Sequence, residues 1–214
     1  MGIRRMARAC IAMLAALWLA SPVYATPIAI IVNTTSLAGT AVDLAFDLTA
    51  STANTVKITD FSSDGALDDS TIALIGDVSS GMLSSPPVII GGTPGFDEYL
   101  QSMTLGDSLA FTFDTTSTQV ASGSPPTPDT FAFFILVDGI PVISDDPQDP
   151  TGALLTFDFG IEIPVLTLYS SATLPVREGI VSNNVAEPGA LALVIAALLA
   201  LAAMLPVARI QSRK

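Results

Sequence analysis

Aspartates occur in two short loops in a pattern that suits a calcium ion. They are Asp64, Asp68 and Asp69 around Gly65, and Asp145, Asp146 and Asp149 in a segment interrupted by proline. Calcium takes roughly six to eight oxygen ligands, which acid-rich loops between strands can supply. Neither loop has the alternating acids and closing Glu of an EF-hand, and Asp also caps backbone donors in ordinary solvated turns. Solvated turns are therefore the favoured interpretation, and the second loop is the better candidate for Ca²⁺.

Residues for the common catalytic mechanisms are scarce. The chain has no His and one Cys, Cys10, so a classical triad and the usual zinc ligands cannot be built. The glycine-rich run 91–95 lacks the lysine of a phosphate-binding loop. Paired carboxylates for glycoside hydrolysis would come from few glutamates, and their separation in space does not follow from the sequence. Outside residues 1–25 there is no Trp, and the only tyrosines are Tyr99 and Tyr169. We therefore expect a protein that is not an enzyme and that has no cofactor other than a calcium ion.

The charge of the chain is strongly asymmetric. All 20 acidic residues lie between Asp43 and Glu187, where the only basic residues are Lys57 and Arg177. A field of this sign repels phosphate backbones, so nucleic acid is excluded as a partner. With 50% hydrophobic and 13% charged residues, the chain also lies far from the composition of disordered proteins.

Period-two alternation indicates the elements that would position these residues. In 41–48, Val42, Leu44, Phe46 and Leu48 alternate with polar or small residues, and 108–114 repeats the pattern. Such alternation is typical of half-buried strands. Further strands are predicted at 27–33, 54–61, 71–78, 86–90, 98–104, 130–137, 140–144, 153–159 and 161–170.

Turn signals separate these segments. Asp138-Gly139 between two apolar runs predicts a tight hairpin, and Pro141 predicts an edge strand because proline cannot donate to a ladder. Short strands with turns every ~8–12 residues favour an all-β fold, an antiparallel β-sandwich of which a jelly roll is one form. We assign this exported domain to residues 26–185.

The first 25 residues have the organisation of a signal peptide. Three arginines precede the apolar run 9–20, and Val23-Tyr24-Ala25 is a small-x-small cleavage site before Thr26. The sequence therefore predicts export and a signal peptidase as processing partner.

The C-terminal segment 186–214 predicts a membrane helix. Residues 189–208 are uncharged, and at ~1.5 Å per residue they would span ~30 Å, the thickness of the hydrocarbon layer. Arg209, Arg213 and Lys214 follow the run, which predicts a cytoplasmic C-terminus and an exported domain.

The same segment resembles the PEP-CTERM sorting signal. Glu187 and Pro188 stand where that signal has its acidic-proline motif, followed by the apolar helix and the basic end, whereas Ala186 replaces the motif's first proline. The resemblance implies an inner-membrane intermediate that an exosortase-type enzyme cuts near the motif, after which the protein is at the cell surface or extracellular.

Parts of the exported domain are similar to a family of small PEP-CTERM proteins without an established activity. The matching stretches are 33–40, 61–65, 76–79 and, in outline, 96–100. We expect an exported, non-enzymatic surface or extracellular-matrix protein, associated with exopolysaccharide. The alternatives are a calcium-dependent binding or adhesion module and a surface protein that keeps its membrane anchor.

Overall fold

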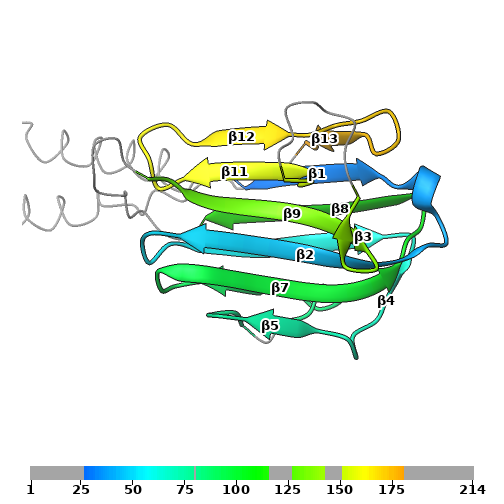
Figure 1. Ribbon diagram of the computed structural model, residues 1–214, viewed down its shortest axis with the longest axis horizontal. Coiled ribbons are helices and arrows are strands. Elements are labelled where there is room, and N and C mark those ends of the chain that lie inside the picture. Colours follow the sequence, from blue (N-terminus) through cyan, green and yellow to red (C-terminus); the bar gives the residue numbers. More distant parts are fainter. Residues whose placement is uncertain (1–26, 80, 116–126, 143–150, 181–214) are drawn as a thin grey trace, which may run out of the picture. The chain divides into compact units, whose positions relative to one another are not determined.

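The computed structural model describes residues 27–79, 81–115, 127–142 and 151–180, all of which fall in one compact unit, Val23–Val181. Within these residues the chain forms two antiparallel sheets, here called sheet A and sheet B (Figure 1). Sheet A has the order β13 (Val176–Glu178), β1 (Ile28–Asn33), β8 (Ser108–Thr115), β3 (Thr55–Ser63), β6 (Val88–Gly91). Sheet B has the order β12 (Val165–Leu168), β11 (Leu155–Phe159), β9 (Asp129–Val137), β2 (Ala41–Ala50), β7 (Gly95–Thr104), β4 (Ala66–Leu67), with β10 (Ile140–Pro141) beside β9 and β5 (Ala73–Ile75) beside β7.

The prediction of an all-β antiparallel fold is confirmed. Helical structure in the described ranges is limited to the short 3₁₀ turn η1 (Thr35–Leu37), and all the pairings between strands are antiparallel. The long strands lie where the alternation places them, whereas the two- and three-residue strands β4 and β13 were not predicted. Two or three residues are too few for a period-two pattern to stand out.

The two sheets pack face to face across one apolar core. Val42, Leu44, Phe46 and Leu48 of β2 are buried as predicted, and so are the alternate residues of β8. Phe46 of sheet B meets Phe111 of sheet A edge to face, with ring centroids 5.2 Å apart. Aromatic pairs prefer this geometry, and it adds about 0.5–1.5 kcal/mol to the burial of the rings. The architecture is therefore β-sandwich-like.

The predicted hairpin is present between β9 and β10. Asp138 and Gly139 have φ angles of 51° and 76°, the left-handed conformation that a two-residue type I′ turn requires at both positions. Ile140 then pairs with Val137, and β10 pairs only with β9 in the described part of the chain. The prediction that Pro141 lies in an edge strand is confirmed.

Successive long strands alternate between the two sheets. β1 and β3 belong to sheet A and β2 to sheet B, and β6 to β9 repeat the alternation. As a result β2 lies between β7 and β9, which are its hydrogen-bonded neighbours but are far from it in the sequence. The outer side of sheet B therefore combines side chains from several distant segments.

Candidate functional site

The outer face of sheet B carries the side chains that alternate with the buried ones. From β2 and β7 these are Asp43, Ala45, Asp47, Thr49, Phe96, Glu98, Leu100 and Ser102, and from β9 and β11 they are Thr130, Ala132, Phe134, Leu136, Thr156 and Asp158. In Figure 1 these strands form the front layer of the ribbon. Four of the residues are acidic and none is basic, so the face is a concentrated acidic surface.

Two of these carboxylates face each other directly. Asp47 of β2 is the cross-strand partner of Glu98 of β7, and on its other side Asp47 lies beside Ala132 of β9. Burial, and then the charge of Glu98, raise the pKa of Asp47 from 3.8 to about 7. Its Oδ1 atom is buried and has no hydrogen-bond partner among the described residues. Like charges directly opposite each other destabilise a sheet, so this pair favours sharing a proton or binding an outside donor.

The other two acids of the face have hydroxyl partners on neighbouring strands. Ser102 Oγ donates to Asp43 Oδ1 at 2.5 Å, and Thr130 Oγ1 donates to Asp158 Oδ1 at 2.6 Å. These carboxylates are thus stabilised from within the sheet. Of the four acids on this face, Asp47 is the one with a buried carboxylate oxygen that has no hydrogen-bond partner among the described residues.

An apolar row crosses the same face next to the carboxylate pair. Phe134 of β9, Ala45 of β2, Leu100 of β7 and Ala73 of β5 are successive cross-strand partners. Phe96, two residues before Glu98 in β7 and on the side away from Leu100, is 48% exposed. In this row Ala45 is only 2% exposed and Phe134 packs against a buried cluster of Ala132, Ala153 and Tyr169, so the exposed ring beside the carboxylates is that of Phe96. Acceptor oxygens beside an exposed ring suit a ligand that has both hydroxyl groups and C–H faces, as sugars do.

The basic residues of the described domain lie on the other sheet. Lys57 of β3 pairs with Asp114 of β8, and Arg177 of β13 pairs with Ile31 on the outward side of sheet A. Burial raises the pKa of Asp114, and Lys57 partly offsets that effect. The acids on the outer face of sheet B therefore have no cationic partner on their own face within the described ranges.

The acidic loop predicted around Gly65 does not form a common site. The Asp64 carboxylate accepts hydrogen bonds from the backbone of Ser108 and Asp107, and Asp68 accepts from Ser70. Asp69 accepts from two side chains elsewhere. Backbone hydrogen bonding by Ser108 lowers the pKa of Asp64, and the Ser70 side chain lowers that of Asp68. These contacts are those of solvated turns. In the described ranges no three acidic residues are close enough to hold a metal ion.

One aspartate with a structural role was missed in the sequence. Asp129, at the start of β9, is fully buried and accepts hydrogen bonds from Ser51 N at 2.6 Å, Ser51 Oγ at 2.9 Å, Thr52 Oγ1 at 2.5 Å and Asn54 Nδ2 at 2.8 Å. Burial alone would raise its pKa, but these hydrogen bonds outweigh burial and lower it. The turn between β2 and β3 is thereby held to β9. The run 51–54 of Ser, Thr, Ala and Asn was a signal for the turn, but it did not indicate its distant partner.

A second polar cluster is formed by the buried side chains of Tyr99 and Gln101 in β7 and by their hydrogen-bond partners. Tyr99 Oη donates to Gln101 Oε1 at 2.6 Å, Gln101 Nε2 donates to Asp69 at 2.8 Å, and Ser84 Oγ donates to the same carboxylate at 2.8 Å. Burial raises the pKa of Tyr99 to about 12. These hydrogen bonds attach the loops that contain Asp69 and Ser84 to the inward-facing side of β7, so their role is structural.

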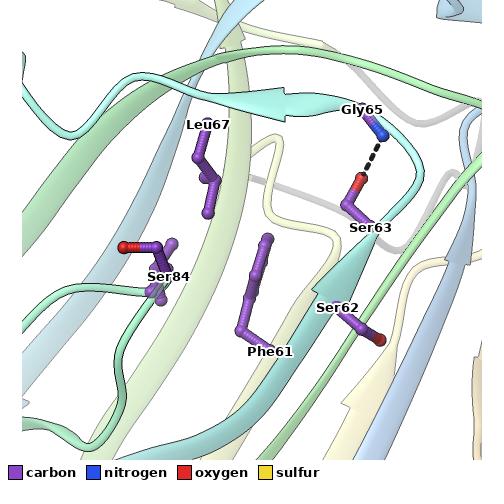
Figure 2. A pocket seen from close by; sticks show the side chains of 7 residues that line it. Phe61, Ser62, Ser63, Gly65, Leu67 and Ser84 are labelled. Atoms are coloured by element: carbon purple, nitrogen blue, oxygen red, sulfur yellow. Dashed lines mark hydrogen bonds between the residues drawn. The ribbon is translucent and has the colours of Figure 1, made fainter.

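A hollow of about 230 Å³ lies beside this polar cluster, with which it shares Ser84 (Figure 2). It is lined by Phe61, Ser62, Ser63, Gly65, Leu67, Leu83 and Ser84. Ser63 Oγ accepts from Gly65 N at 3.0 Å, and the Ser84 hydroxyl is held by Asp69. The lining has no titratable side chain, and two of its three hydroxyls are engaged within the protein. We therefore place the candidate site on the outer face of sheet B and not in this hollow.

Several predicted sites lie outside the described residues. They are the calcium candidates Asp145, Asp146 and Asp149, the signal cleavage residues Val23, Ala25 and Thr26, and the sorting residues Ala186, Glu187, Pro188, Arg209, Arg213 and Lys214. These assignments stay predictions. No helix within the described ranges is long and apolar enough to cross a membrane, and the predicted spanning run 189–208 is not part of them.

Comparisons of the chain with protein-family models, with curated proteins and with solved structures gave no match.

Proposed function

We propose that this is an exported, non-enzymatic surface or extracellular-matrix protein, sorted through a C-terminal exosortase-type signal. The observation that carries the proposal is the order of segments in the sequence: a signal-type segment, a β-rich domain, and an apolar run between Glu187-Pro188 and a basic end. The described domain fits a scaffolding role, because its buried polar groups Asp129 and Tyr99 are used to join loops to strands. A β-sandwich, of which a jelly roll is one form, is the proposed scaffold.

Exopolysaccharide is the proposed partner of the outer face of sheet B. Carboxylates of Asp47 and Glu98 would accept hydrogen bonds from sugar hydroxyls, while the exposed ring of Phe96 would contact C–H faces. The acidic surface favours a neutral or cationic polymer over an acidic one, because like charges repel.

The intact mass of the protein from the native host tests the sorting proposal. Membrane and culture-medium fractions are analysed separately. A species that begins at Thr26 and ends near Glu187, found outside the inner membrane, is expected. A species that ends at Lys214 and stays in the membrane would contradict sorting and would support the permanent anchor.

Binding to the host's polysaccharide tests the proposal that exopolysaccharide contacts the outer face of sheet B. Phe96→Ala removes the most exposed ring of the face, and we expect about tenfold weaker binding, the equivalent of about 1.4 kcal/mol. Ile140→Ala is the matched control, because Ile140 is 65% exposed but pairs with Val137, which belongs to the inward-facing set of β9. Equal loss in both variants, or none in either, would count against this face.

The calcium-dependent module is the second candidate. It is favoured by the acid-rich loop that contains Asp145, Asp146 and Asp149, which lies outside the described residues, and by the excess of 20 acidic over two basic residues in 43–187. A ligand that binds only the folded state raises the melting temperature. A melting temperature that does not change with millimolar calcium would eliminate this candidate.

A further inference from the structure

One row of residues across the outer face of sheet B places two acids side by side between apolar neighbours. From β9 to β5 the row is Ala132, Asp47, Glu98 and Ile75, each the cross-strand partner of the next. Figure 1 shows β7, which carries Glu98, between β2 and β5. Ile75 is half exposed, and so is the ring of Phe96, two residues before Glu98. The row therefore has two carboxylates and no basic or hydroxyl side chain to compensate them.

The other acids of this face are placed differently. Asp43 and Asp158 each lie opposite a hydroxyl residue, which donates a hydrogen bond to the carboxylate. Acids that serve only to hydrate the face are compatible with that arrangement. Asp47 instead lies opposite Glu98 and has a buried oxygen without a partner among the described residues, and such a like-charge pair destabilises the sheet. An unfavourable local arrangement beside an exposed ring points to a site at which an outside group compensates the two charges.

We propose that this row binds the protonated amines of an amino-sugar polymer, with an ammonium group between the carboxylates of Asp47 and Glu98 and a sugar C–H face against Phe96. The assignment rests on the proposed contact with exopolysaccharide and specifies the class of sugar. An ammonium group has three donors, so it can serve both carboxylates, whose Cβ atoms are about 4.5–5.5 Å apart as cross-strand partners. Phe96 is the diagonal neighbour of Asp47, about 7–8 Å away, which places the ring beside the bound amine.

Charge selects the amine over other sugar groups. A neutral hydroxyl donates to one carboxylate and leaves the repulsion between the two in place, whereas an ammonium group attracts both and makes charge-assisted hydrogen bonds. An acidic sugar would add a third negative charge. The raised pKa of Asp47, about 7, reflects the same preference, since the pair already tends to take up one positive charge as a proton. Residues 43–187 contain 20 acids and two bases, so the domain also attracts a cationic polymer from a distance.

Shape favours an amino sugar over a basic peptide. A lysine side chain carries its ammonium group on a flexible stem that loses rotamer freedom when it binds. In an amino sugar the amine is fixed to a rigid ring, which presents a C–H face beside the charge. Half-exposed Phe96 and Ile75 on either side of Glu98 suit such a ligand, because it can bury apolar surface and pair its charge without ordering a long side chain.

Binding of matched oligosaccharides to the full chain, kept in an uncharged detergent, tests the proposal. The probes are short oligomers of glucosamine and of N-acetylglucosamine with the same linkage and length, which differ in the charge of the amine. We expect the glucosamine oligomer to bind at least about tenfold more tightly, because acetylation removes the charge and two of the three donors. This comparison uses the unsubstituted chain and does not depend on the folding of any variant.

Two variants and a matched control locate the amine. Asp47→Asn and Glu98→Gln should each weaken binding of the glucosamine oligomer by about tenfold, because each removes one charged acceptor. Asp158→Asn removes the same charge from the same face, but its carboxylate is already held by Thr130. Screening by salt limits the effect of this more distant charge, and we expect a change of less than about threefold.

The possible results separate this proposal from the proposed function. Equal affinity for the two oligomers, or equal losses in Asp47→Asn and Asp158→Asn, would overturn the amine site, while Phe96-dependent binding of the host's polysaccharide would still support the proposed function. A lysine oligomer of the same charge that binds as tightly as the glucosamine oligomer would overturn the choice of a sugar and indicate a basic protein as partner. If neither oligomer nor the host's polysaccharide binds, both proposals are wrong.

Discussion

Replacing Asp47 by asparagine should change how the stability of the domain depends on pH. Burial and the opposed Glu98 raise the pKa of Asp47 from 3.8 to about 7 in the folded chain. Between about pH 4 and pH 7 the folded chain therefore binds more protons than the unfolded chain. It follows that this carboxyl lowers stability as pH rises through that window, and that its effect levels off above pH 7.

The magnitude follows from the same pKa values. A change from 3.8 to about 7 corresponds to at most about 4 kcal/mol, at about 1.36 kcal/mol for each tenfold change in proton affinity. Because the carboxyl is partly exposed, solvent screening reduces this value, and we expect about 1–2 kcal/mol. The amide side chain of the Asp47→Asn variant has no charge to desolvate and does not repel Glu98. This variant should match the parent near pH 4 and exceed its stability by about 1–2 kcal/mol at pH 8.

Chemical denaturation of both proteins from pH 4 to pH 8.5 provides the measurement. The chain has no histidine, and its other carboxyl groups are common to both proteins, so the difference between the two pH profiles reports on Asp47. Glu98→Gln is the informative second variant, and it should recover less of the stability because burial is the larger cause of the raised pKa. A difference between Asp47→Asn and the parent that is constant across this pH range would refute the reasoning.

Three further predictions concern the forces that hold the domain together, each measured by denaturant unfolding. Asp129→Ala should cost about 3 kcal/mol or more, because it removes the acceptor of four hydrogen bonds from the β2–β3 turn, and a loss below about 1 kcal/mol would contradict that role. Gly139→Ala should cost about 1 kcal/mol through backbone strain alone, since an added Cβ meets no atom within 4 Å; an unchanged stability would argue against the left-handed turn. Phe46→Ala should cost about 3–5 kcal/mol, against less than about 1 kcal/mol for Phe96→Ala, and similar costs would mean that Phe46 is not central to the core.

The sequence was sufficient to predict the longer strands and the sides on which their residues lie. Alternation in 41–48 placed Phe46 inward and Asp47 outward, because side chains point to opposite faces at each step along a strand. The Asp138-Gly139 turn was also predictable, since few residue pairs adopt left-handed conformations at both positions. These features depend on neighbours in the sequence, so local patterns are enough to reveal them.

The tertiary structure alone decided which strands are neighbours and in what register. Nothing local indicates that Asp47 faces Glu98, or that Asp129 binds the turn at Ser51, because these pairs join segments about 50 and 78 positions apart. The position of β5 at the margin of sheet B, beside β7, is likewise a property of strand order, since an apolar triplet is equally compatible with a central strand. Side-chain direction follows from the period of a single strand, whereas strand pairing depends on packing the whole core, which no single segment of the sequence specifies.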